Sequence, residues 1–158
     1  MIETANTIKL ILDKAKVNCY CKTSGASGLH VYIPLAKKYD YKTATAFAEV
    51  IAHLTQERLS KFTSVERSLQ KRGNKIYVDF LQNRKGQTIA APYSVRPRDG
   101  ATVSTPLEWN EVKRGLSPSD FTIKNILSRV KKKGDLWKPV LSKGESIDQA
   151  LDLLLSTP

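Results

Sequence analysis

A short loop rich in serine and glycine, residues 22–30, carries the residue types best suited to binding chemistry. Its sequence is Lys-Thr-Ser-Gly-Ala-Ser-Gly-Leu-His, so that two serines and two glycines fall within five positions. A tight turn of this composition can direct several backbone N–H groups and hydroxyls at one point, which suits an anion such as phosphate. His30, at the start of the next apolar run, can add a further donor. A plain hairpin turn remains the alternative, because serine and glycine also serve turns.

Asp79 is a second candidate, because it interrupts the apolar run Tyr77-Val-Asp-Phe-Leu81. Alternation of apolar residues over 75–81 predicts a strand with Asp79 near its middle. A carboxylate inside an apolar strand is costly unless a metal ion or a hydrogen-bond donor meets it. We therefore expect Asp79 to be a buried acid with a partner.

The overall charge points to a polyanionic partner. The 158 residues include 26 Lys and Arg against 15 Asp and Glu, a formal net charge of +11, which favours nucleic acid or an anionic surface. Residues 60–75 are especially basic, and Lys71, Arg72 and Lys75 are predicted to contact DNA phosphates. A solvated loop is an equally good account of them. No apolar run approaches the ~20 residues of a membrane span, so no membrane insertion is expected.

The cysteines and the N-terminal residues favour a cytoplasmic protein. Cys19 and Cys21 lie two residues apart in a predicted strand, which suits neither a disulfide bond nor, without a second cysteine pair, a zinc site. Reduced, buried thiols are expected. The N-terminus lacks the apolar region of a signal peptide. The length suits one domain with a substantial core.

Hydrophobic periodicity predicts an α+β domain with a mainly antiparallel sheet and packed helices. The expected helices span residues 2–16, 41–59 after the N-cap Asp40, a segment beyond 121 that ends at Gly134, and a last stretch from about Ser146, with a helical turn at 108–114. The expected strands span 17–22, 29–33, 75–81 and 88–91, with a short extended segment at 103–106. The first two strands form a hairpin that the Ser/Gly loop joins.

Three motifs in order resemble the polymerase domain of bacterial DNA ligase D, a member of the archaeo-eukaryotic primase superfamily. They are Lys-Thr-Ser-Gly-x-x-Gly-Leu-His at 22–30, Val-Asp-Phe-Leu-Gln-Asn at 78–83 and Ala-Ala-Pro-Tyr-Ser-Val-Arg at 90–96. Pro106-Leu-Glu-Trp109 and Asp135-Leu-Trp137 are also similar to that domain. The resemblance spans residues 2–142, so we expect a partial, primase-like polymerase domain at 1–142 and a C-terminal helix and tail at 143–158.

The resemblance implies template-directed nucleotidyl transfer that fills or extends broken DNA ends during non-homologous end joining, with Mn or Mg as the divalent metal. DNA ends and nucleoside triphosphates are the implied substrates, and Ku and the ligase domains of a longer protein are the implied partners. The residues implied to bind the nucleotide are Ser24, Gly25, Ser27, His30, Gln82 and Arg96. Asp79 is the implied catalytic, metal-binding carboxylate.

Two departures from the family pattern affect the expected activity. Ser27 stands where many relatives carry Lys, so one charge contact to the triphosphate is lacking. The family's paired acids, an Asp-x-Asp motif, lie upstream of the segment that matches residues 2–16, and this chain begins after them. Two metal ions need more oxygen ligands than Asp79 alone can supply. We therefore expect an incomplete fold and a poor catalyst.

The alternative function is a non-catalytic module that binds nucleic acid and nucleotide. If the upstream segment supplies strands to the sheet, its absence leaves a strand edge exposed. The chain is then expected to self-associate through that edge.

Overall fold

A three-stranded antiparallel sheet carries the Ser/Gly loop in this computed structural model, which describes residues 1–141 and 143–156. Its strand order is β2-β1-β5, with β1 at Tyr20–Thr23, β2 at Leu29–Tyr32 and β5 at Pro106–Leu107. β1 and β2 form the predicted hairpin, in which Cys21 faces Val31 and Lys22 faces His30. The β1–β5 pairing joins residues that are more than 80 positions apart. The sheet therefore unites the loop with the middle of the chain.

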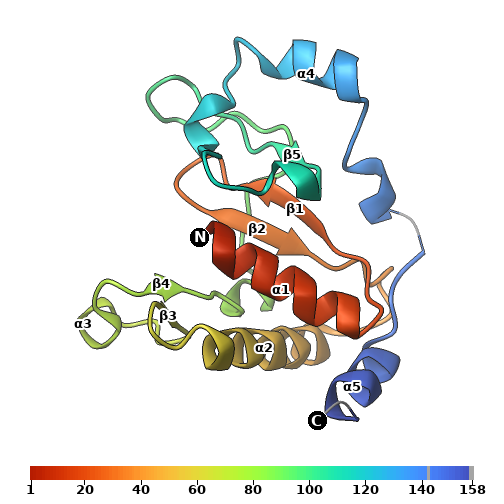
Figure 1. Cartoon of the computed structure of the whole chain (residues 1–158). Coiled ribbons are helices and arrows are strands. Elements are labelled where there is room, and N and C mark those ends of the chain that lie inside the picture. The colour runs from red at the N-terminus through yellow and green to blue at the C-terminus, as the bar shows by residue number, and fades with distance from the viewer. Residues whose placement is uncertain (142, 157–158) are drawn as a thin grey trace.

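Helices flank this sheet. α1 (Ile2–Lys14) lies between the β1–β2 hairpin and α2 (Tyr41–Arg58), and α4 (Ile126–Lys133) and α5 (Ile147–Leu155) follow later in the chain (Figure 1). A second, parallel pair consists of β3 (Thr63–Ser64) and β4 (Ile76–Tyr77), with the short helix α3 (Leu69–Arg72) between them. Short 3-10 helices lie at Leu81–Asn83, Trp109–Glu111, Pro118–Asp120 and Lys138–Leu141. The α+β class and its antiparallel sheet are confirmed, with the β3–β4 pair as a parallel exception.

The core explains why the helices form where the sequence predicts them. Its larger cluster gathers apolar residues from α1, α2, α5 and the segment before β1: Ile11, Leu12, Ala15, Val17, Cys19, Phe47, Ile51, Ile147 and Ala150. The Asp40 carboxylate caps α2 by accepting a hydrogen bond from the Thr43 N–H at 2.7 Å. Ser146 caps α5 in the same way, through the Gln149 N–H. α5 thus packs into the same core as α1, and the proposed boundary at residue 142 stays a prediction.

Both cysteines are free and buried, as expected. Burial raises the pKa of each thiol to about 12, so both remain protonated at neutral pH. No helix in residues 1–141 and 143–156 is long and apolar enough to cross a bilayer.

The predicted strand at 75–81 is much shorter than expected. β4 ends at Tyr77, and the chain turns into the 3-10 helix Leu81–Asn83. The Asp79 carboxylate accepts a hydrogen bond from the Leu81 N–H at 2.9 Å, a local turn that competes with continuation of the strand. The prediction that Asp79 lies buried in mid-strand is therefore wrong, since its side chain is exposed.

The predicted strand at 88–91 does not form. Residues 93–96, a little further along the chain, run alongside residues 102–104 instead. The Tyr93 N–H donates to the Ser104 carbonyl, the Arg96 N–H donates to the Thr102 carbonyl, each at 2.7 Å, and Val95 bridges to Val103. This irregular pairing carries residues 93–96 to the side of the Ser/Gly loop.

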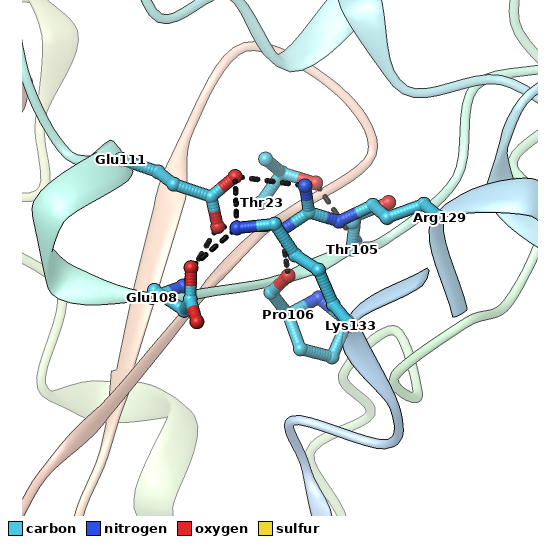
Figure 2. A network of polar contacts seen from close by, with 7 residues as sticks. All are labelled: Thr23, Thr105, Pro106, Glu108, Glu111, Arg129 and Lys133. Atoms are coloured by element: carbon cyan, nitrogen blue, oxygen red, sulfur yellow. Dashed lines mark hydrogen bonds and ion pairs between the residues drawn. The ribbon is translucent and has the colours of Figure 1, made fainter. Parts of the chain in front are cut away.

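A polar network fastens α4 to the sheet (Figure 2). The Arg129 guanidinium donates to both carboxylate oxygens of Glu111, at 2.8 and 2.6 Å, and to the Pro106 carbonyl at 3.0 Å. Lys133 joins from the next turn of α4 and pairs with Glu108 and Glu111. Burial alone would raise the pKa of Glu111, but the hydrogen bonds from Arg129 lower it to about 2.

Substitution Glu111→Gln is expected to lower the free energy of unfolding at pH 7 by about 2 kcal/mol, because it removes a charge-assisted, bidentate contact that is mostly shielded from solvent. Since the pKa of Glu111 lies below its ordinary value of 4.5, this stabilisation is complete above pH 4.5 and is lost as the pH falls toward about 2. Urea unfolding of both proteins over this pH range measures it.

The matched control is Glu108→Gln, which removes a more exposed carboxylate that pairs with Lys133. Its expected effect is about 0.5 kcal/mol, because exposed ion pairs contribute little. An equal decrease in the free energy of unfolding in the two variants would contradict the view that Glu111 contributes most of the stability of this network.

Candidate nucleotide-binding site

Ser24 closes the hairpin loop from within. Its N–H donates to the Gly28 carbonyl at 2.9 Å, and its hydroxyl oxygen accepts hydrogen bonds from the Ala26 and Gly28 N–H groups, each at 3.1 Å. Three of the N–H groups predicted to form an anion nest are therefore used inside the loop. The Ser24 hydroxyl proton stays available, and the two bonds that its oxygen accepts polarise it as a donor. Ser27 lies exposed at the loop tip.

Gly25 lets Arg96 pack directly against the loop. Gly25 is buried, with φ at +69°, and a Cβ built on it would lie 2.5 Å from Arg96 Cγ and 3.0 Å from the Ser104 nitrogen. The Thr102 hydroxyl donates to the Gly25 carbonyl at 2.6 Å. Among the residues that the structure describes, the Arg96 guanidinium has no ion-pair or hydrogen-bond partner. Its charge is therefore available to a ligand.

Lys22 is the residue that sequence reasoning missed. It faces His30 across the hairpin, and its side chain is fully buried. The Nζ atom lies 2.8 Å from the Ala90 carbonyl, 2.6 Å from Ser104 Oγ and 3.1 Å from His30 Nδ1. Burial, followed by the nearby Arg96 charge, lowers the pKa of Lys22 to about 8. The sequence offered one signal for a role of Lys22 in the site: it is the first residue of the Ser/Gly motif. In the structure, its neighbours Cys21 and Thr23 are both buried.

His30 is uncharged at neutral pH. Burial, and then the positive charges of Lys22 and Arg96, lower its pKa to about 4, while the Asp79 carboxylate acts in the opposite direction. The ring is therefore a neutral hydrogen-bonding group beside two cations. The effect of the Asp79 carboxylate on the pKa of His30 indicates that Asp79, although exposed, lies near the loop.

The structure thus brings most of the predicted nucleotide-binding residues to one place. Ser24, Gly25, His30 and Arg96 lie around the loop, and Asp79 and Gln82 follow β4 in exposed positions. In residues 1–141 and 143–156, no group of three or more His, Cys, Asp or Glu is gathered in a way that could hold a metal ion. Asp79 alone therefore suits one ligand position of a metal, with triphosphate oxygens and water as further ligands.

The three basic residues predicted to bind DNA lie apart from the loop, around α3 at the edge of the molecule (Figure 1). Two of them already make contacts within the protein. The Arg72 guanidinium lies 4.9 Å from the centre of the Tyr77 ring, and Lys75 Nζ donates to the Ser60 carbonyl at 2.8 Å. Lys71 is exposed. Of these three residues, only Lys71 has a side chain that makes no hydrogen bond, ion pair or ring contact with the described residues.

Comparison with known proteins identifies the family. The family described as the LigD primase-polymerase domain matches residues 1–137. The chain belongs to this family. The resemblance seen in the three sequence motifs is confirmed.

Relatives of the LigD family cover most of this chain. The bifunctional non-homologous end joining protein LigD of Bacillus subtilis is 37% identical over 134 residues, which are 84% of this chain and 22% of that protein. The multifunctional LigD of Mycolicibacterium smegmatis is 30% identical over 142 residues, 89% of this chain and 18% of that protein. The chain thus spans about a fifth of the length of these LigD relatives.

A solved LigD structure has the same fold. The polymerase domain from Mycobacterium tuberculosis ligase D in complex with DNA superposes with a TM-score of 0.82 at 27% identity, and the match covers 91% of this chain and 50% of that chain. The fold of this chain therefore matches that of the LigD polymerase domain over half of the length of the solved chain.

Substitution Gly25→Ala is expected to lower the free energy of unfolding by about 2 kcal/mol more than Gly73→Ala. Both glycines have φ between +60° and +70°, so both variants incur backbone strain. Only at Gly25 does the added Cβ meet Arg96 and the Ser104 backbone, whereas nothing lies within 4 Å at Gly73. Urea unfolding of the two variants measures the difference, and equal losses would contradict close packing of Arg96 on the loop.

Proposed function

We propose that this chain binds the triphosphate of an incoming nucleotide, and a DNA end, as the nucleotidyltransferase domain of a protein that acts in non-homologous end joining. One observation carries the proposal: the Lys22 ammonium and the Arg96 guanidinium lie together at the Ser/Gly loop, and no carboxylate among the described residues pairs with either.

Two neighbouring cations without an acid partner favour an anionic ligand. The Lys22 ammonium is buried away from water, and the Arg96 guanidinium lies close enough to lower the pKa of Lys22 further. Both effects disfavour the charged form of Lys22 until a negative group arrives. A triphosphate supplies several charges and accepts hydrogen bonds from the planar Arg96 fork, the Ser24 hydroxyl and the His30 ring. Gly25 shapes the loop beneath them, and exposed Ser27 and Gln82 would reach the nucleotide from the loop tip and from the 3-10 helix.

A divalent metal ion, Mn or Mg, is proposed to accompany the triphosphate. Asp79 would be its protein ligand and the catalytic carboxylate on this chain, which its charge near His30 supports. Such an ion neutralises charge on the transferred phosphoryl group when it is bound. Because one carboxylate supplies few of the six oxygen ligands that each ion requires, we propose that catalysis by this chain alone is weak.

Substitution Arg96→Ala is expected to weaken binding of ATP with Mn²⁺ at least tenfold, because it removes a charge-assisted donor. Isothermal titration calorimetry measures the affinity of the purified chain. The control is Lys132→Ala, which removes the same charge from an exposed position on α4 and should leave the affinity within twofold. No binding by the unsubstituted chain, or equal effects in both variants, would contradict the proposal.

Primer extension separates the polymerase from the alternative, a non-catalytic module that binds nucleic acid and nucleotide. The substrate is a gapped duplex with a downstream 5′-phosphate, supplied with nucleotides and Mn²⁺. We expect nucleotide binding with little extension. Extension at a normal rate that disappears in Asp79→Asn would show a complete catalyst and contradict the expected weak activity.

Lys71, Arg72 and Lys75 are proposed to contact the DNA backbone. Lys71→Ala is expected to weaken duplex binding and to reduce the slope of log affinity against log salt concentration by about one, since one phosphate contact is lost. Fluorescence anisotropy at several salt concentrations measures the slope, with Lys132→Ala as the control. An unchanged slope would remove Lys71 from the interface. Arg72 is a poorer first choice, because its stacking on Tyr77 also stabilises the fold.

Ku and the ligase domains of a longer protein are proposed partners, and a bacterial cytoplasmic location near the nucleoid would follow from action on chromosomal DNA. Pull-down with purified Ku tests the first contact.

Self-association through the outer edge of the sheet is also proposed, since β2 pairs only with β1 among the described residues. Sedimentation at increasing concentration should then show dimers, and a monomer throughout would contradict this.

A further inference from the structure

The side chains of Lys22 and His30 contact each other across the hairpin. They are register partners on β1 and β2, so their side chains emerge on the same face of the sheet. The Lys22 Nζ lies 3.1 Å from Nδ1 of the ring, and no other hydrogen bond of the ring is made within the described residues. The other ring nitrogen, Nε2, is therefore open to a ligand.

The hydrogen bonds around Lys22 decide which atom donates. The Ser104 hydroxyl gives its single proton to the Thr23 carbonyl at 2.8 Å, so its oxygen must accept from Lys22. The Ala90 carbonyl can only accept. These two bonds use two of the three ammonium protons, and the third is directed at His30 Nδ1.

An ammonium group has no lone pair, so it can only donate to the ring. His30 Nδ1 must then be the unprotonated nitrogen. Since His30 is neutral at pH 7, its single proton resides on Nε2. The ring therefore presents an N–H donor to the site, rather than a lone pair that would repel a phosphate oxygen.

We propose that Lys22 is a positioning residue that fixes His30 in the Nε2–H tautomer and so directs a hydrogen-bond donor at the triphosphate. This inference rests on the proposed function for the identity of the ligand. The same ammonium holds the Ala90 carbonyl, at the start of the segment that carries Arg96. Lys22 thereby orients both the ring on β2 and the segment 90–96.

The tautomer is measured directly by ¹⁵N NMR of the imidazole nitrogens in the unliganded chain. The sequence has two histidines, and His53, exposed on α2, serves as an internal reference. We expect His30 to show the Nε2–H form in the unsubstituted chain and a mixture of tautomers in Lys22→Met, which keeps the volume of the side chain but has no donor. Ser104→Ala keeps the Lys22–His30 contact and should keep the tautomer. An Nδ1–H form in the unsubstituted chain would overturn the proposal without reference to any variant.

A double-mutant cycle tests whether Lys22 acts through His30. Lys22→Met is expected to weaken binding of inorganic triphosphate at least tenfold, and clearly less in a His30→Ala background. Additive effects would overturn the positioning role. Failure of the unsubstituted chain to bind triphosphate would overturn the proposed function, whereas the NMR experiment decides the tautomer in either case.

Discussion

A buried ammonium without a carboxylate partner is the main constraint on this molecule. A carbonyl, a hydroxyl and an imidazole nitrogen surround the Lys22 ammonium and compensate for its loss of water. Each of these groups comes from a different part of the chain, so the hairpin, the segment at residue 90 and the segment before β5 must all be in place. The contacts of Lys22 with Ala90 and Ser104 lie at the two ends of the irregular backbone between residues 90 and 104.

The threonines next to Lys22 serve the same requirement. Thr23 and Thr105 are fully buried, and Thr23 Oγ1 accepts a hydrogen bond from the Thr105 N–H at 2.9 Å (Figure 2). Their hydroxyls both donate to the Val103 carbonyl. Buried polar groups that satisfy one another in this way hold β1 against residues 103–105 with little freedom. The Arg129–Glu111 contact then fixes α4 on the outer side of the same strands.

Sequence reasoning succeeded where the signal is local. Asp40 and the amphipathic patterns of α1, α2 and α5 predicted the helices, and the glycines of the loop predicted the hairpin. It failed at Asp79, where a side-chain hydrogen bond to the backbone of Leu81 ends the strand that alternation predicts. It also missed Lys22 as a site residue. The groups that surround its Nζ include Ala90 and Ser104, and no local sequence pattern predicts contacts between residues so far apart in the chain. The apolar pattern singled out Asp79, but only motif resemblance supplied Arg96 and connected both residues with the Ser/Gly loop.

The order of the contacts along the chain has a consequence for assembly. Lys22 and His30 are 8 residues apart, whereas Ala90 and Ser104 lie 68 and 82 residues beyond Lys22. Closing the longest of these loops costs roughly 2 kcal/mol more chain entropy than closing the shortest. The hairpin alone therefore leaves the ammonium hydrated, and only docking of residues 90–104 withdraws it from water. A fragment of the chain that stops before residue 90 would contain the whole Ser/Gly motif and still lack the electrostatic environment that distinguishes it from an ordinary turn.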